Sequence, residues 1–163
     1  DFSNQVVFLI DEIEAHLHPA WQRTVVPSLL SVMDELSSRA SVQLITATHS
    51  PLVMTSVEPD FDDKIDAWFD LDFEDKQVVL RHRDFEKHGD AGTWLLSEAF
   101  DLQSGRSLQS EALVEQASQL LESEAPSRDA IQKMNNDLVQ ALGPTDDFLF
   151  SWRYVCRQKG WLK

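Results

Sequence analysis

Two acids, Asp11 and Glu12, directly follow an apolar run, and they are the residues of this chain best suited to chemistry on a phosphate. Residues 6–10 read Val-Val-Phe-Leu-Ile, and a continuous run of this kind favours a fully buried strand over residues 5–10. Cleavage of a phosphoanhydride needs Mg²⁺ at the phosphate oxygens and a positioned water. We expect Asp11 to face the metal and Glu12, on the other side of the strand, to face the water. The simpler alternative is an acid pair that begins a surface loop.

A second apolar run, residues 42–47, ends close to His49. Apolar residues at helical spacing predict a helix over residues 19–38 between the two runs, with Pro27 inside it. Strand, helix and strand at this spacing form a βαβ unit, whose strands are parallel. The imidazole of His49 would then reach the edge that carries Asp11 and Glu12, where it could contact a γ-phosphate oxygen or the attacking water. Alone, a histidine in this place is more often a polar loop residue.

His16 and His18 leave a different chemistry open. Two histidines at this spacing can face one metal from an extended segment, so Asp11, His16, His18 and His49 could form the zinc site of a hydrolase or nuclease. The same segment could instead cap the helix that begins at Pro19 and form a contact surface.

The rest of the chain predicts a hairpin followed by helices. The alternation of Phe69 and Leu71 with Asp70 and Asp72 predicts strands with one buried apolar face and one solvated acidic face, which Trp68 interrupts. The predicted strands cover residues 65–71 and 77–83, and the predicted helices cover residues 51–56, 91–101, about 107–121, about 127–142 and about 147–159.

The composition narrows the class of protein. The chain has 163 residues, of which 42% are apolar, enough for a sizeable core. No apolar run approaches the roughly 20 residues of a membrane span, and the single cysteine, Cys156, fits a reducing compartment, so we predict a cytoplasmic protein without a membrane partner. The net charge is −14, and many of the acidic residues are concentrated in residues 58–75. That surface should repel a phosphate backbone, so any nucleic acid would be contacted through other surfaces.

The motifs resemble a known family. Residues 6–12 resemble a Walker B strand with its catalytic glutamate, residues 13–19 are similar to the D-loop of ABC-type ATPases of the SMC and overcoming-lysogenization-defect kind, and residues 44–51 are similar to the H-switch strand. Asp-Glu-Ile-Glu-x-His-Leu-His-Pro-x-Trp followed by Thr-His-Ser-Pro resembles the AAA-family ATPases of bacterial antiphage systems such as Septu and retrons. The motifs span about residues 5–55, and residues 92–102 show a weaker likeness.

The resemblance implies roles for individual residues. ATP and Mg²⁺ would be the cofactors, with Asp11 acting on the metal, Glu12 as the general base and His49 at the γ-phosphate. His16 would lie with its neighbours where the D-loop crosses to a second ATPase subunit, so that two copies sandwich ATP between them. By resemblance, hydrolysis would control a partner nuclease in antiphage defence.

The sequence also departs from the family pattern. It contains no Gly-x-x-x-x-Gly-Lys-Ser/Thr loop and no Leu-Ser-Gly-Gly signature before Asp11. We therefore expect the C-terminal part of a longer ATPase, whose N-terminal part supplies the donors that hold the phosphates.

The predicted fold class is α/β, the C-terminal part of a P-loop core with parallel strands, followed by a β-hairpin and an α-helical appendage. The predicted division places the ATPase part in residues 1–103 and the appendage in residues 104–163. A third hypothesis makes the appendage a non-catalytic docking module. Its aromatic residues would be Trp94, Phe148, Phe150, Trp152 and Trp161.

Overall fold

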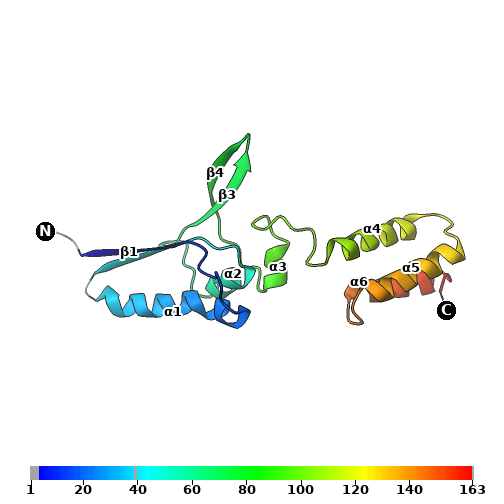
Figure 1. Ribbon diagram of the computed structural model, residues 1–163, viewed down its shortest axis with the longest axis horizontal. Coiled ribbons are helices and arrows are strands. Elements are labelled where there is room, and N and C mark those ends of the chain that lie inside the picture. The colour runs from blue at the N-terminus through cyan, green and yellow to red at the C-terminus, as the bar shows by residue number, and fades with distance from the viewer. Residues whose placement is uncertain (1–3, 39, 163) are drawn as a thin grey trace. The chain divides into compact units, whose positions relative to one another are not determined.

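The computed structural model describes residues 4–38 and 40–162 of the chain (Figure 1). The described chain forms two compact units, the first ending at Gln103 and the second beginning at Ser104. The first unit contains β1 (Gln5–Ile10), α1 (Pro19–Ser37), β2 (Ser41–Thr46), α2 (Pro51–Val57), β3 (Trp68–Glu74), β4 (Gln77–Arg83) and α3 (Ala91–Leu95). The second contains α4 (Leu108–Glu122), α5 (Arg128–Ala141) and α6 (Asp147–Gln158). The mixed α/β class is confirmed, while the functional content of the two parts stays a prediction.

β1 and β2 form a parallel pair, as the strand, helix and strand spacing predicts. Their register runs from Gln5 opposite Ser41 to Ile10 opposite Thr46. One face of the pair packs against α1, where Ile10 and Leu44 contact a small core built around Val26. The two strands and the helix between them therefore form a two-layer βα arrangement in the first unit.

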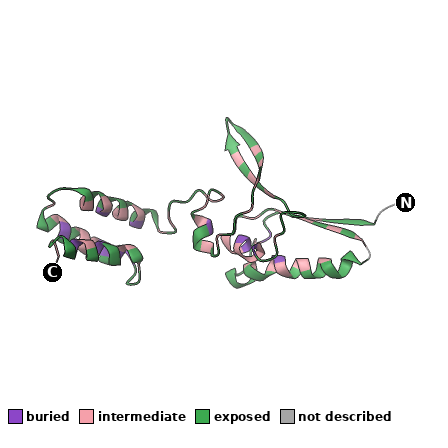
Figure 2. Cartoon of the chain, turned by 180° about the vertical axis from the view of Figure 1, so that it is seen from behind, coloured by how far each residue is buried: buried purple, intermediate pink, exposed green. Residues whose placement is uncertain are grey.

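The prediction that these strands are fully buried is wrong for the described chain. Leu9 keeps 74% of its surface exposed, and Val7 and Ile45 are exposed beside it. These side chains point away from the face that carries Ile10 and Leu44, because successive residues of a strand alternate between faces. A strand is buried on both faces only when a layer covers each of them, and within the described residues α1 covers one face only (Figure 2).

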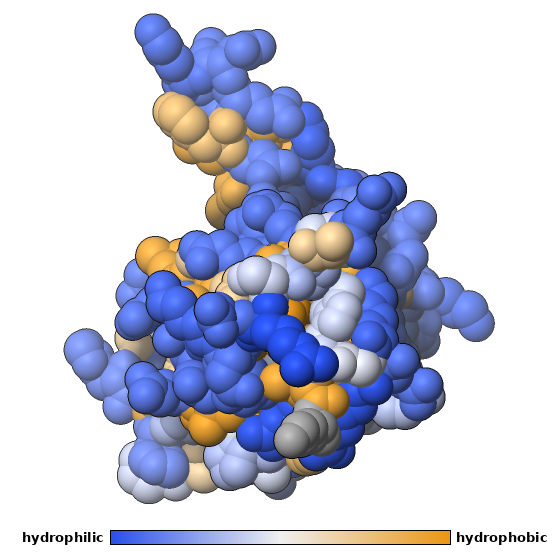
Figure 3. Space-filling view, turned by 90° about the vertical axis from the view of Figure 1, so that its right-hand side faces the viewer, coloured by the Kyte–Doolittle hydropathy of each residue, from blue (hydrophilic) through white to orange (hydrophobic). Residues whose placement is uncertain are grey.

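The hairpin of β3 and β4 has its apolar face outward, which contradicts the predicted buried face. Leu71 lies opposite Leu80 in the antiparallel register, and these residues are exposed together with Phe69, while Phe73 is 73% exposed. Apolar surface is visible on the projecting hairpin at the top of Figure 3. The alternation correctly separated two faces, but no other element of the described chain covers the apolar one.

The acidic face of the hairpin is instead the better covered one. Asp72 pairs with Arg81 at 3.4 Å, and Asp70 pairs with Arg83 at 3.5 Å. The aliphatic parts of long arginine side chains cover neighbouring surface while their charged ends stay near water. Two of the predicted solvated acids are therefore half-buried under cross-strand ion pairs.

The helix predicted over residues 91–101 is shorter than expected. α3 ends at Leu95, because the Trp94 carbonyl accepts from the Ser97 hydroxyl at 2.7 Å and from the Ser97 amide at 3.0 Å. A serine hydroxyl that binds a nearby carbonyl competes with helix continuation. The chain then turns, and Asp101 has a positive φ of 51°.

Trp68, which interrupts the alternation of β3, joins the hairpin to the rest of the first unit. Its ring lies edge-on to the fully buried Trp94 with centroids 6.0 Å apart, and Phe85 contacts both rings. Edge-to-face pairs of this kind add to the stability that burial of the rings provides. Trp68 therefore lies at the base of the hairpin, where the hairpin packs against the rest of the first unit.

A buried carboxylate, Glu58, completes this aromatic cluster. It accepts hydrogen bonds from the His88 amide at 2.7 Å, the Gly89 amide at 3.0 Å and the Trp94 indole at 2.6 Å. Burial acts to raise the pKa of the Glu58 carboxyl, but the three donors favour the charged form, and the net result is a pKa below the ordinary 4.5. The charged form of Glu58 therefore stabilises the fold.

We expect Glu58→Gln to lower the free energy of unfolding at neutral pH by about 1–3 kcal/mol, the usual cost of weakening buried hydrogen bonds to a charge. Because the folded pKa is lowered, this stabilisation is present above 4.5 and is lost as pH falls through the folded value. Thermal unfolding of the full chain, followed by aromatic circular dichroism at neutral and acidic pH, measures the difference. Glu86→Gln at an exposed acid is the control, and a pH-independent difference would contradict the prediction.

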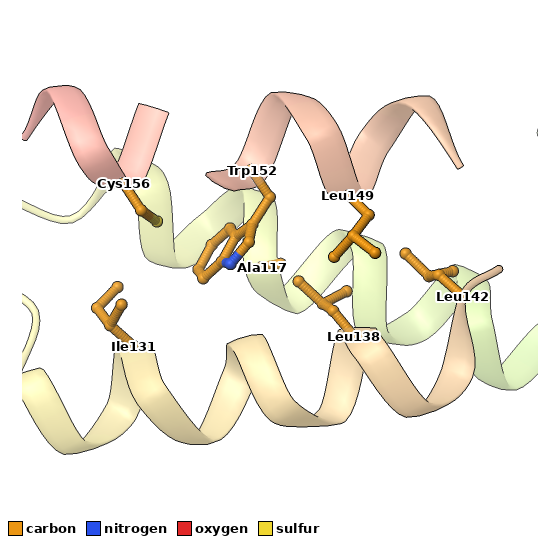
Figure 4. Packing of buried hydrophobic residues seen from close by; sticks show 7 residues of the cluster. All are labelled: Ala117, Ile131, Leu138, Leu142, Leu149, Trp152 and Cys156. Carbon is orange, nitrogen blue, oxygen red and sulfur yellow. The ribbon is translucent and has the colours of Figure 1, made fainter. Parts of the chain in front are cut away.

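The second unit is a group of three helices around an apolar core. Figure 4 shows that α4, α5 and α6 each contribute side chains, with the Trp152 ring between the helices. Ser107, Ser127 and Asp146 cap the three helices by accepting backbone amides. Arg106 holds the Asp146 cap through a pair at 3.0 Å. This pairing lowers the pKa of the Asp146 carboxyl below its usual value.

The aromatic residues proposed for docking lie mostly in cores. Trp94 and Trp152 are fully buried, and Phe148 and Trp161 pack against the core of the second unit. Phe150 is the exception, at 56% exposed. A docking surface built from the buried rings is thus excluded, because side chains inside a core cannot contact a partner.

Within the described residues, no helix has the length and apolar content that a membrane crossing requires.

Candidate functional site

The segments that follow β1 and β2 leave the same edge of the parallel pair. The Ala47 amide donates to the Ile10 carbonyl at 3.0 Å, and the Ile13 amide donates to the Ala47 carbonyl at 3.3 Å. The ladder therefore continues past both strand ends and ties the two segments together. Asp11 and Glu12 leave the edge on one segment and His49 leaves it on the other, which is the juxtaposition that the βαβ pattern predicts.

Asp11 and Glu12 are both exposed, and within the described part of the chain neither carboxylate has a hydrogen-bond or ion-pair partner. The expected alternation across a strand does not apply to them, because β1 ends at Ile10. Glu12 has a φ of 46°, in the left-handed region that residues other than glycine seldom adopt. A tight turn, closed by the Ala15 amide on the Glu12 carbonyl at 2.7 Å, sets its direction instead.

Within the described residues, His16 and His18 do not join a metal site. His16 is exposed, with a φ of 63°, and the Nδ1 atom of His18 accepts the Ala20 amide at 3.2 Å as the N-cap of α1. In residues 4–38 and 40–162, no group of three or more His, Cys, Asp or Glu side chains is arranged to hold a metal ion. The described chain thus does not assemble the zinc site considered from the sequence, and His18 follows the capping alternative.

Glu14 is a residue of this site that sequence reasoning missed. Its carboxylate accepts the Thr48 hydroxyl at 2.6 Å through one oxygen and the His49 amide at 2.6 Å through the other. Burial acts to raise the pKa of the Glu14 carboxyl, but these donors favour the charged form and bring the pKa below its ordinary value. The signal available in the sequence was a third acid, Glu14, close to Asp11 and Glu12. Only the fold shows which donors its carboxylate binds.

A second set of hydrogen bonds continues this connection into the helices. The Ser50 hydroxyl donates to Gln22 of α1 at 2.7 Å, and it caps α2 by accepting the amides of Leu52 and Val53. Gln22 in turn donates to the Leu17 carbonyl at 3.0 Å. The segments after β1 and β2 are therefore held to each other and to both helices.

The donor set at this edge fits a hard cation. Mg²⁺ is usually bound through one or two carboxylates together with substrate phosphates and water. Asp11 and Glu12 are exposed, adjacent and without internal partners in the described chain, so their oxygens are available for such a role. Carboxylate oxygens and an imidazole that follow strand ends at one sheet edge suit the chemistry of a phosphate ester or anhydride.

The comparisons with known proteins match the stretch that contains these residues. Residues 4–55 match the family described as "AAA domain, putative AbiEii toxin, Type IV TA system". The chain is 47% identical over 51 residues to "Retron Vc95 probable ATPase" of Vibrio cholerae serotype O1 biovar El Tor, an alignment that covers 31% of this chain and 9% of that protein. It is 38% identical over 52 residues to "Retron Ec83 probable ATPase" of Escherichia coli, covering 32% and 8%.

The chain thus matches less than a tenth of the length of these curated relatives. The matched stretch contains β1, α1, β2 and both segments of the candidate site. Residues 4–55 accordingly match an AAA-type ATPase family and are similar to part of the retron ATPases, so the family resemblance seen in the sequence is confirmed for this stretch.

Proposed function

We propose that this chain supplies the water-activating edge of an ABC-type ATPase in the complete protein. Asp11 would hold Mg²⁺, Glu12 would act as general base, and His49 would contact the γ-phosphate of ATP. The observation that carries the proposal is the parallel pairing of β1 and β2, whose following segments bring the acids and the histidine out at one edge.

The chemistry of each side chain follows from its type. The Glu12 carboxylate accepts a proton from the attacking water, which becomes a better nucleophile as its O–H bond weakens. The His49 imidazole donates a hydrogen bond to a γ-phosphate oxygen, where negative charge accumulates during transfer. Asp11 would hold Mg²⁺, and the ion would neutralise negative charge on the phosphates of ATP.

We extend the proposal to the assembly of two protein copies and to the consequence of ATP hydrolysis. Two copies of the protein would sandwich ATP, with His16 near the partner subunit, and its exposed position at a turn supports this role. Other segments of the protein would supply the phosphate-holding donors. Hydrolysis would control a partner nuclease in antiphage defence, an output that the resemblance of the motifs implies.

We expect His49→Ala to lower the kcat of ATP hydrolysis by the complete protein about 100-fold, the usual loss when one donor to a developing charge is removed. Phosphate release with saturating Mg²⁺ and ATP measures it. His82→Ala on the exposed face of the hairpin is the matched control and should keep the wild-type rate. Absence of ATP turnover by the wild-type protein, or equal rates in both variants, would overturn the assigned roles.

A further inference from the structure

We propose that Glu14 is a positioning residue of the ATPase site, which fixes the backbone at His49 and thereby aims the imidazole at the γ-phosphate. This inference rests on the proposed function and adds a residue to it. Glu14 acts through His49 and does not itself touch ATP.

Glu14 connects two segments that are far apart in the sequence. Glu14 and the residues that it binds lie 34 and 35 positions apart in the sequence, on the two separate segments that leave the sheet edge. Both carboxylate oxygens are used, one on the Thr48 hydroxyl and one on the His49 amide, each at 2.6 Å. Short hydrogen bonds to a charged acceptor are the strong ones, so this pair fixes both the position and the direction of the His49 backbone.

The backbone and the imidazole of His49 differ in how they are held. The residue is exposed, and within the described residues no hydrogen bond engages its imidazole. The backbone is therefore the part of His49 that the protein fixes, while the ring stays available for a ligand. The hydrogen bonds that Glu14 accepts from the segment of His49 therefore limit the positions that the ring can reach, and supporting contacts of this kind position catalytic groups.

The hydrogen bonds around Thr48 form a continuous set. Its hydroxyl donates to Glu14 and accepts the Ser50 amide at 3.1 Å, so both functions of the hydroxyl are used. Ser50 is buried and anchored to Gln22 of α1. His49 thus lies between two restrained neighbours, and the Glu14 carboxylate is the only acidic group among these contacts in the described part of the chain.

Loss of a residue that only stabilises the fold and loss of a residue that positions His49 should change the kinetics differently. Loss of a residue that only stabilises the fold lowers the amount of folded protein and leaves the kinetics of the folded fraction unchanged. Loss of a positioning residue lowers kcat more than it weakens ATP binding, because the contact of the imidazole with the γ-phosphate strengthens as negative charge develops in the transition state. The effect should also require His49, since Glu14 acts through it.

The test uses ATP turnover by the complete protein with Glu14→Gln, His49→Ala and the double variant, a cycle that isolates the coupling of two residues. We expect Glu14→Gln to lower kcat about tenfold with KM for ATP within about threefold. In the His49→Ala background the same change should alter kcat by less than about twofold. Glu35→Gln, at an exposed acid of α1, is the control for loss of a charge.

Thr48 provides a second, independent measurement. Thr48→Ser keeps the hydroxyl and should retain nearly the wild-type kcat, while Thr48→Val keeps the shape without the hydroxyl and should lower kcat as Glu14→Gln does. Thermal unfolding of each variant identifies the folded fraction.

The outcomes separate the two proposals. A wild-type kcat in Glu14→Gln, or an equal loss with and without His49, overturns the positioning role while the proposed function stands if His49→Ala alone is impaired. Absence of ATP hydrolysis by the wild-type protein overturns the proposed function itself, and the positioning role with it.

Discussion

Glu12→Gln is expected to lower the kcat of ATP hydrolysis by the complete protein about 1,000-fold, the largest kinetic effect predicted for this chain. The amide has nearly the size of the carboxylate but cannot accept a proton from the attacking water. The side chain is exposed and has no partner in the described residues, so the substitution removes no internal contact. The turn that gives Glu12 its positive φ should therefore persist in the variant.

ATP binding separates loss of chemistry from loss of the site. The variant should retain Mg²⁺-dependent ATP binding while phosphate release falls, because the general base is needed only when the water attacks. Glu122→Gln, at an exposed acid of α4, is the matched control and should hydrolyse ATP at the wild-type rate. Undiminished hydrolysis by Glu12→Gln would remove the assigned base.

Trp152→Ala is expected to have the largest effect on stability, about 3–5 kcal/mol, which is the usual cost of truncating a buried tryptophan. The ring is fully buried and lies among side chains from all three helices of the second unit (Figure 4). A unit as small as residues 104–163 has little stability in reserve. We therefore expect the variant to lose most of the helical structure of this unit at ambient temperature.

Phe150→Ala on the same helix is the matched control for this prediction. Phe150 is 56% exposed, so its truncation should cost less than about 1 kcal/mol. Far-ultraviolet circular dichroism of the full chain during urea unfolding measures both variants. If Trp152→Ala were no less stable than Phe150→Ala, the assignment of Trp152 to the core would be wrong.

The elements around the candidate site were predictable because their signals are local. Two continuous apolar runs separated by a helical pattern predict adjacent parallel strands, and β1, α1 and β2 form as expected. The role of His18 and the exposure of the hairpin's apolar face were less predictable. His18 became a helix cap because it precedes Pro19, and the apolar face of the hairpin is exposed because alternation defines two faces without saying which one another element covers.

The sequence by itself determined the order of the elements, the parallel edge and the residue types that reach it, because hydrophobic periodicity and chain connectivity act over neighbouring residues. Only the tertiary structure decided that Glu12 turns out of the strand and that Glu14 binds Thr48 and His49. Those contacts join residues that are more than 30 positions apart. Which donor meets a given carboxylate depends on the packing of whole elements, and no local pattern records that packing.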